Sequence, residues 1–369
     1  MGAGIAGLTL AGRLCQQGRP PVIVERSVPA AAGYAIGLYP LGSCVLHGFG
    51  TYERLREVSL VLERYELASE SGEVLRSFDM SVLTDDIGPV FMVSRAELVR
   101  VLELSCASAD LRRGVSISSL EQHRDGVDVT FDDGSNDRFD IVIGCDGMGS
   151  QTRDLVFGLA TGYDSGWLLW TWWVSKARFA PEVAREWWGA GNMLGAYPAP
   201  GRVMCAAGGP EETMRGEDVR SLLHRHFAKL IDRVPEVGAA IGEFDAGHPW
   251  PMSDIRARHW VHGRVALCGD AAVGFMPTAG VGASNAMRAA AALADELSRA
   301  DAASIPLALE LYEKRCRARV EANQTNSRRL ARVMFVRPAF LAKTRDELTR
   351  RFPPKWALSE IVGSVHRPF

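Results

Sequence analysis

Three short segments of the sequence combine glycines with an acidic side chain, a combination suited to holding a phosphorylated nucleotide. They are GAGIAG at Gly2–Gly7, IGCDGMGSQTR at Ile143–Arg153 and LCGDAAVGFMPTAGVG at Leu267–Gly282. Glycines let backbone N–H groups approach a pyrophosphate, and a carboxylate accepts hydrogen bonds from sugar hydroxyls. The order and spacing of the segments predict that all three contact one molecule of FAD.

The first segment predicts the turn into the first helix of a dinucleotide-binding fold. Gly2 permits the tight turn, Gly4 lets the backbone approach a pyrophosphate, and Gly7 allows close packing of the helix. Apolar residues then recur at helical spacing, and a short strand ends at Glu25, placed to accept hydrogen bonds from a ribose diol. A chance glycine triplet in a helix turn is the alternative. The predicted FAD contacts in this unit are Gly2, Gly4, Ile5, Ala6, Gly7, Glu25 and Arg26.

The glycine turn should be preceded by an apolar strand of about five or six residues. The sequence begins at Met1 instead. Such a strand would be central in the sheet and paired on both sides. We therefore expect a few upstream apolar residues to belong to the protein, a truncated chain or a substitute strand being the alternatives.

The second and third segments each follow a short apolar strand. In the second, Asp146 comes after the strand and is expected to face a dinucleotide at the sheet edge, although Asp-Gly is also a common turn. In the third, Asp270 is placed to hold ribityl hydroxyls, and Pro277 stiffens the next turn. A helix then begins, and its N-terminal amides would stabilise negative charge on a reduced flavin. A glycine-rich helix start that only packs is the alternative. The predicted catalytic residues are Pro277, Gly280, Val281 and Gly282, with Ala283 as a further FAD contact.

Composition predicts an ordinary folded protein of two to three domains. The 369 residues are 47% hydrophobic, and the net charge of -2 argues against general nucleic-acid binding. Seven scattered cysteines imply neither disulfides nor zinc. No apolar stretch reaches 18 residues and no signal peptide precedes the glycine turn, so we expect a cytoplasmic protein without a transmembrane segment.

The pattern of elements predicts an α/β fold, with a Rossmann-like FAD-binding domain interleaved with a β-rich substrate domain. Its first strand is apparently missing from the chain. Leu120, in a predicted strand, is included among the FAD contacts. The expected domain ranges are 1–60, 90–160 and 255–325 for FAD, 61–89 and 161–254 for substrate, and 326–369 for a C-terminal helical segment.

With these motifs in place, the whole chain resembles the single-component FAD-dependent aromatic hydroxylases, the family of para-hydroxybenzoate hydroxylase and the tetracycline-inactivating monooxygenases. Its three segments match the family's glycine fingerprint, DG motif and GD motif. The resemblance implies that Arg95 contacts the flavin and that Glu186–Gly189 with Tyr197 belongs to the strands over the substrate pocket. Trp260 also matches a frequent family tryptophan. The sequence departs from the family pattern at Val273, Ser284, Arg288 and Ala289.

The resemblance also implies a chemistry. NADPH or NADH, bound transiently, reduces FAD; oxygen adds at C4a, and the hydroperoxide passes one oxygen atom to an aromatic ring. No second nucleotide fold is needed, and the glycines at 189–195 lead into Tyr197 and Pro198 and not into a helix. The expected partners are a small aromatic substrate and molecular oxygen, with the protein a monomer or homodimer.

Tryptophans crowd the region expected to bind substrate. Alternation along a strand puts Trp170 and Trp172 on one face and Trp167 and Trp173 on the other, so one pair could line a pocket while the other packs in a core. Either pair could equally be plain core. The predicted substrate contacts are Tyr34, Tyr39, His47, Trp170, Trp172, Trp187 and Tyr197.

Three other functions remain open on the sequence. A flavin-dependent halogenase would carry a WxWxIP segment, which Trp170–Ser175 partly imitates, but it would need an early lysine and the first here is Lys176. A flavin dehydrogenase or reductase of related fold would share the same cofactor motifs. A non-catalytic FAD-binding protein is the third alternative.

Overall fold

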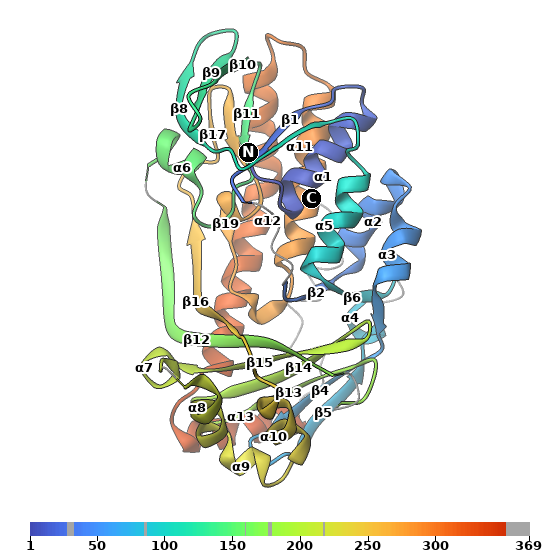
Figure 1. Cartoon of the computed structure of the whole chain (residues 1–369), viewed down its shortest axis with the longest axis vertical. Coiled ribbons are helices and arrows are strands. Elements are labelled where there is room, and N and C mark those ends of the chain that lie inside the picture. The colour runs from blue at the N-terminus through green and yellow to red at the C-terminus, as the bar shows by residue number, and fades with distance from the viewer. Residues whose placement is uncertain (28–32, 85–86, 159, 176–178, 217, 352–369) are drawn as a thin grey trace.

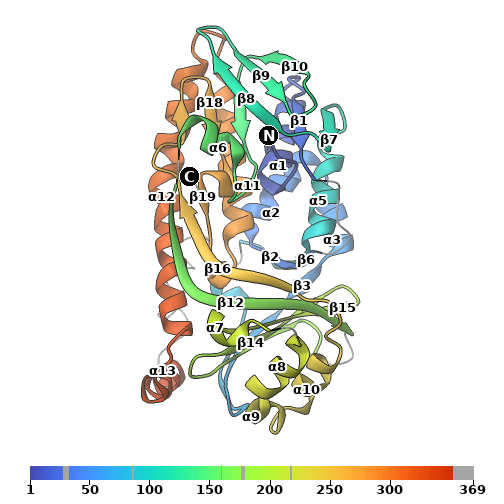
Figure 2. The ribbon, with the colours of Figure 1, turned by 60° about the vertical axis from the view of Figure 1, so that its left-hand side comes forward.

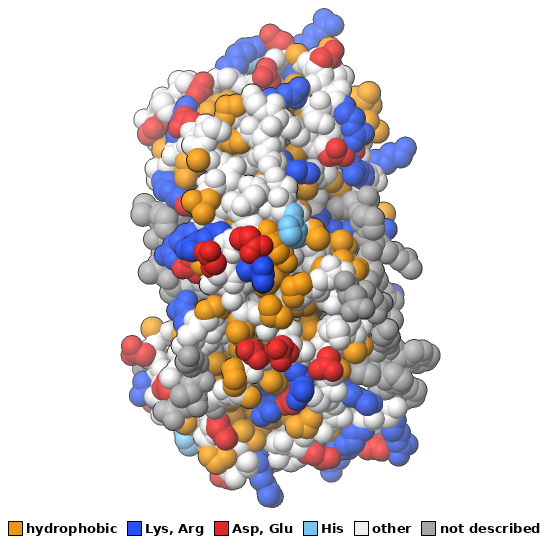
Figure 3. All heavy atoms as spheres, turned by 90° about the vertical axis from the view of Figure 1, so that its right-hand side faces the viewer, with side chains coloured by type: hydrophobic (Ala, Val, Ile, Leu, Met, Phe, Trp, Pro, Cys, Tyr) orange, Lys and Arg blue, Asp and Glu red, His pale blue; other side chains and the backbone are white. Residues whose placement is uncertain are grey.

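The computed structural model describes residues 1–27, 33–84, 87–158, 160–175, 179–216 and 218–351. The last 18 residues of the expected C-terminal segment therefore lie outside the described part. The predicted α/β fold is confirmed: helices and small sheets form the upper part of the molecule in Figure 1, and one large sheet forms the lower part. On the face seen in Figure 3, acidic and basic side chains are interspersed with hydrophobic ones.

Two small parallel sheets lie at the centre of the upper part. β1 (Val22–Glu25) pairs with β7 (Asp110–Arg113), and β11 (Val142–Gly144) pairs with β18 (Val265–Leu267), which continues antiparallel to β17 (Val261–His262). Met1 joins the two sheets: its amine donates to the carbonyl of Ile143 at 2.7 Å and its carbonyl accepts from Cys145 at 2.7 Å. Gly2 N–H donates to the carbonyl of Val24 at 2.7 Å. Met1 and Gly2 thus lie where the sequence predicts a central strand.

Helices cover these sheets because both present apolar side chains, which are buried together. α1 (Ile5–Gln16) packs between α5 (Arg95–Leu104) and α11 (Gly282–Ser298), and α2 (Pro40–Phe49) and α3 (Tyr52–Val58) flank them. α5 is amphipathic: Ser94 caps it by accepting the N–H of Glu97, and Leu98, Val101 and Leu102 are buried. α12 (Ile305–Met334) spans 30 residues and runs along the length of the molecule in Figure 2. None of the described helices is long and apolar enough to cross a membrane.

An antiparallel sheet closes the other side of the upper part. It consists of β8 (Ile117–Gln122), β9 (Val127–Phe131) and β10 (Asn136–Phe139), with α6 (Gln151–Val156) beside it. Its inward residues share one apolar cluster with Val24, Val142 and Val265 of the parallel strands. Leu120 packs against this cluster.

The lower part is an eight-stranded sheet in the order β19-β16-β12-β15-β14-β13-β4-β5, antiparallel except between β13 and β4. Tryptophans and small residues fill its centre, and α7 (Glu211–Met214), α8 (Val219–His226), α9 (Ala228–Ile231) and α10 (Pro235–Gly242) cover one face. The strands are β4 (Arg64–Ser69), β5 (Val74–Asp79), β12 (Thr161–Ser175), β13 (Val183–Trp188), β14 (Met193–Ala199), β15 (Arg202–Pro210), β16 (His248–Arg256) and β19 (Val273–Gly274).

Two features join the parts. β12 bends at a register shift between Asp164 and Leu168, where Gly166 has φ +69°, so that it runs along the upper part and then crosses the lower part (Figure 2). A buried ion pair ties α12 to β16: Arg328 Nε and Nη2 lie 2.7 and 2.6 Å from the two carboxylate oxygens of Asp254.

The remaining elements bridge or extend these parts. β2 (Ala35–Leu38), β6 (Val90–Ser94) and β3 (Leu60–Leu62) form a small sheet between them, and α4 (Ser81–Thr84) follows β5. Two short 3-10 turns, η2 (Gly269–Ala271) and η3 (Pro277–Ala279), flank β19, and α13 (Ala339–Arg351) ends the described chain.

Candidate active site

The three glycine-containing segments meet in space. A Cβ added to Gly2, whose φ is +92°, would lie 2.5 Å from the carbonyl oxygen of Cys145, so the first and second segments touch through their backbones. A Cβ on Gly269 would lie 2.7 Å from Cβ of Ala6, so the third segment packs directly on the start of α1. The predicted convergence of the three segments is therefore present in the fold.

Gly4 and Gly7 occupy opposite situations at the start of α1. A Cβ on Gly7 would lie 2.0 Å from the carbonyl oxygen of Gly2, so this glycine permits the close turn. A Cβ on Gly4 would meet only Nη2 of Arg95, at 3.9 Å, so Gly4 borders open space. No side chain caps the helix at Gly4, which leaves its first amides available to an anion. This arrangement fits a pyrophosphate.

Glu25 lies beside the same turn. Its Oε2 accepts the N–H of Ala3 at 2.8 Å and its Oε1 accepts the N–H of Ser27 at 2.8 Å. Each oxygen keeps a second lone pair, which a ribose hydroxyl could use. Arg26, next in sequence, is exposed.

Asp270 occupies the floor of a crevice. Its side chain is exposed to solvent, yet burial among surrounding protein atoms raises its pKa to about 6, and the charge of Arg95 partly opposes this rise. Tyr34 stands close by: burial and the charge of Asp270 raise its pKa, while Arg95, which also bonds to it, lowers it. A carboxylate that is both accessible and enclosed in this way suits the ribityl hydroxyls of a flavin.

The loop after Asp270 leads into α11. Pro277 and Gly280 are exposed, and Gly280 adopts the left-handed conformation with φ +63°. α11 begins at Gly282, and its N-cap Val281 supplies no side-chain hydrogen bond, so the first amides of this second helix are also available. Tyr39 stands against the loop, with its hydroxyl 3.9 Å from the position of a Cβ on Gly280.

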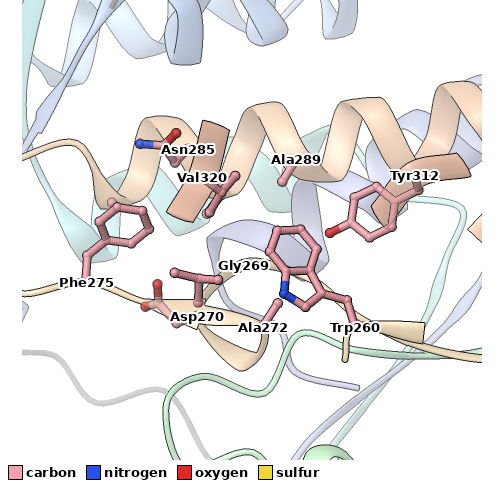
Figure 4. Close-up of a pocket in the computed structure, with 12 residues that line it drawn as sticks. Trp260, Gly269, Asp270, Ala272, Phe275, Asn285, Ala289, Tyr312 and Val320 are labelled. Atoms are coloured by element: carbon pink, nitrogen blue, oxygen red, sulfur yellow. The ribbon is translucent and has the colours of Figure 1, made fainter. Parts of the chain in front are cut away.

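Behind Asp270 a small pocket of about 10 Å³, room for about one water molecule, separates the third segment from α11 and α12. Figure 4 shows Asp270 and Phe275 on one wall, Asn285 and Ala289 on the opposite helix, and the rings of Trp260 and Tyr312 at one end. Trp260, predicted from the family pattern, is buried, and within the described chain its indole N–H has no acceptor.

Two helix N-termini, two carboxylates and an exposed glycine loop therefore lie near one another. Glu25 is bonded at Ala3 and Gly269 packs at Ala6, and three residues of chain span at most about 10 Å. The two acids are thus near enough for one extended dinucleotide to contact both. These residues fit FAD.

Comparison with known proteins agrees with this geometry. The model of one family, described as FAD binding domain, matches residues 1–327. The chain belongs to this family. An FAD-dependent urate hydroxylase from Mycolicibacterium vanbaalenii is 31% identical over 313 residues, covering 79% of this chain and 77% of that protein.

Solved structures of FAD-dependent enzymes share the fold of this family member. The complex of HpxO from Klebsiella pneumoniae with FAD and uric acid superimposes with a TM-score of 0.89 at 26% identity, covering 99% of this chain and 95% of that one. The tetracycline destructase Tet(55) gives a TM-score of 0.77 at 22% identity, covering 100% of this chain and 96% of that one, a likeness of fold alone.

Several predicted contacts need correction. The carboxylate of Asp146 points to the start of α6, where it accepts from the hydroxyl of Ser150 at 2.5 Å and from the N–H and hydroxyl of Thr152, both at 3.0 Å. These hydrogen bonds tie the loop that carries Asp146 to the start of α6. His47 is exposed on α2 and stacks on Tyr52 at 3.6 Å between ring centroids, so its ring is engaged by its neighbour on α3.

The tryptophan prediction was right about alternation and wrong about the face. Trp170, Trp172 and Trp187 pack under the helices α7–α10, where Trp172 Nε1 donates to the carbonyl of Ala240 at 2.9 Å. The other face, which is turned toward the upper part of the molecule, carries Trp173, whose Nε1 donates to the carbonyl of Gly33 at 2.7 Å. Which face of a sheet is covered by helices is a tertiary fact, so alternation alone could not choose.

The face toward the FAD-binding part holds the residues that remain candidates for substrate contact. Tyr34 stands edge-to-face with Trp250 at 5.2 Å, and Tyr39 and Tyr197 belong to one apolar cluster with Ala279 and Val281. Sequence reasoning missed Tyr65 and Trp250, and it named Glu186 only through the family pattern. A carboxylate inside the aromatic strand Val183–Trp188 was the signal that could have identified it.

Proposed function

We propose that this protein is an FAD-dependent monooxygenase that uses NADPH or NADH and molecular oxygen to hydroxylate a small aromatic ring compound. The observation that supports this most is the single place where the N-terminus of α1, Asp270 and the N-terminus of α11 come together. On its far side stands the aromatic face of the eight-stranded sheet. Family membership and the named activities of the similar proteins agree with it.

Bound FAD would supply the redox chemistry, accepting electrons from the nicotinamide and activating oxygen for transfer to the ring. In the proposed arrangement the residues at the start of α1 hold the pyrophosphate through their amides, and Glu25 orients the adenosine ribose. Asp270 and Arg95 hold the ribityl chain. The start of α11 offers amides and the positive end of a helix dipole to negative charge on the flavin ring.

The residues around the loop exclude water from the reacting centre. Tyr39, Ala279 and Val281 are buried and pack with the small sheet and with Tyr65 and Tyr197. An apolar wall of this kind keeps bulk water from reactive oxygen species and holds the substrate ring in one orientation. Pro277, rigid and exposed beside Gly280, limits the movement of the loop.

The experiment is a turnover assay on purified, FAD-loaded protein under labelled oxygen. A panel of aromatic and heteroaromatic compounds is screened for those that accelerate NADPH or NADH oxidation, and each product is analysed by mass. We expect one oxygen atom from O₂ in the product and one nicotinamide oxidised per product. Flavin reduction and turnover without incorporation of labelled oxygen would instead support a dehydrogenase.

A further inference from the structure

The face of the large sheet that meets the FAD-binding part carries a buried carboxylate, Glu186. It is 6% exposed and lies in the middle of β13, opposite Gly195 of β14 and Leu67 of β4. Its Oε1 accepts the hydroxyl of Tyr197 at 2.6 Å, its Oε2 accepts the indole N–H of Trp188 at 2.7 Å, and Tyr65 is a third hydrogen-bond partner. We call Glu186, Tyr65, Tyr197 and Trp188 the acceptor network.

The partners of Glu186 are neutral donors. Burial raises its pKa, and the hydrogen bonds from Tyr197, Tyr65 and Trp188 oppose that rise by stabilising the ionised form. The neighbouring arginine, Arg185, points to the opposite face, where its Nε lies 2.6 Å from Oε2 of Glu66. The charge of Glu186 is therefore balanced by hydrogen bonds and not by a cation.

This bonding fixes what the network offers to a ligand. When Glu186 is ionised its carboxylate can only accept, so the hydroxyl hydrogens of Tyr65 and Tyr197 then point toward it and their remaining lone pairs point elsewhere. Burial and the charge of Glu186 raise the pKa of both phenols well above its usual range, so both keep their protons. Both side chains are only half-buried. With its proton given to Glu186, each phenol oxygen can accept a further hydrogen bond but cannot donate one.

The acceptor network lies beside the proposed flavin loop. Tyr65, Tyr197 and Tyr39 share one apolar cluster with Ala279 and Val281. Tyr39, whose hydroxyl is near Gly280, has its pKa raised to about 12, first by burial and then by the charge of Glu186. A ring held between the loop and the sheet would therefore meet the phenol oxygens of the network.

The sequence of β14 is adapted to this arrangement. A Cβ on Gly195 would lie 2.5 Å from both Cε2 and the hydroxyl oxygen of Tyr197. The ring of Tyr197 thus folds back along its own strand, over Gly195, to reach Glu186. Any larger residue at Gly195 would displace the ring and break this hydrogen bond.

We propose that the acceptor network selects uncharged rings that carry an N–H or O–H donor toward Tyr65 and Tyr197, and that it disfavours rings with a carboxylate there. A carboxylate ligand would bring acceptors against acceptors and a second negative charge beside Glu186. A ring with an N–H or O–H group can instead donate a hydrogen bond to the free lone pairs of the two phenol oxygens. The location of the ring rests on the proposed function; the selectivity rests on the network.

The test uses FAD-loaded protein and three ligands with one ring system: 2-naphthol, 2-methoxynaphthalene and 2-naphthoate. Binding is measured near neutral pH by the change in flavin absorbance and independently by the shift in melting temperature. We expect the wild type to bind 2-naphthol about 10-fold or more tightly than either analogue. Equal binding of 2-naphthoate, or binding of none of the three, would overturn the proposal.

Substitution then assigns the selectivity to its cause. In Glu186→Gln the amide can donate as well as accept, which lets the phenol hydroxyls turn outward, so the preference for 2-naphthol over 2-naphthoate should fall about 10-fold. Glu66→Gln, the same change on the opposite face of the sheet, is the matched control and should keep it. If Glu186→Gln does not fold, Tyr197→Phe serves, and it should lower the preference for 2-naphthol over 2-methoxynaphthalene.

These readouts do not require turnover. Selective binding without oxygenated product would contradict the proposed function and leave the acceptor network standing. Oxygenation with an unchanged ligand preference in both Glu186→Gln and Tyr197→Phe would contradict the network and leave the proposed function standing.

Discussion

Gly4→Ala should separate cofactor binding from folding, because the structure places the added methyl group in open space. Among the described residues other than its chain neighbours, the only atom within 4 Å of that methyl is Nη2 of Arg95, at 3.9 Å, an ordinary contact. The backbone of Gly4, at φ -85° and ψ -173°, is one that alanine adopts freely. Alanine is a poorer N-cap than glycine, but it also restricts the unfolded chain, so the free energy of unfolding should change by less than about 1 kcal/mol.

The same methyl group would stand where the pyrophosphate must approach the amides of α1. Loss of one hydrogen bond to a charged group costs about 1.5–3 kcal/mol, so the affinity for FAD should fall roughly 10- to 150-fold. The assay is titration of apoprotein with FAD, followed by quenching of flavin fluorescence, beside urea unfolding of the same apoprotein.

Gly7→Ala provides the contrast within the same turn. Its methyl group would lie 2.0 Å from the carbonyl oxygen of Gly2, so the helix must shift, and the free energy of unfolding should fall by about 1–3 kcal/mol or more. Unchanged FAD affinity in Gly4→Ala would refute the placement of the pyrophosphate. A Gly4→Ala protein as unstable as Gly7→Ala would refute the open crevice.

Two further substitutions test the acids. The affinity of the wild type for FAD should fall as the pH is lowered through about 6, the pKa of Asp270, because hydroxyl donors favour its ionised form. Asp270→Asn should bind FAD roughly 10- to 150-fold more weakly and lose this pH dependence in the same titration. Asp254→Asn leaves the charge of Arg328 uncompensated and should lower the free energy of unfolding by about 3–5 kcal/mol in urea, with FAD affinity retained. Asp79→Asn, at an exposed pair with Arg64, should cost below about 1 kcal/mol; equal losses for Asp254→Asn and Asp79→Asn would contradict the burial argument.

The sequence predicted best where a function depends on a few consecutive residues. The positions of Gly4 and Gly7 at a helix start and of Asp270 after a strand followed from the sequence, because a glycine turn and a strand end depend on immediate neighbours; their contacts with FAD stay a prediction. The apolar spacing over residues 95–106 is typical of an amphipathic helix, and the structure has one at Arg95–Leu104.

Sequence reasoning failed where the role of a residue depends on a partner far along the chain, or where local hydrogen bonds use a side chain that was expected to bind the cofactor. Asp146 ends a strand as a cofactor ligand would, but Ser150 and Thr152 take its oxygens. Trp172 and Trp173 were correctly assigned to opposite faces, yet only the position of α10 decides which face is core. The role of Glu186 depends on Tyr65 and Tyr197, which come from two other strands.

The short strand β19 has a mechanical consequence. It is the edge strand of the large sheet, where Val273 and Gly274 pair with Arg256 and Ile255 of β16, and it lies between Asp270 and Pro277 on the chain. The loop between Asp270 and Pro277 and the large sheet are therefore joined by backbone hydrogen bonds. Separating the loop from the sheet would break these backbone hydrogen bonds. We therefore expect the site to keep its shape when no ligand is bound, so that ligands are selected by a preformed site and not by a closing motion.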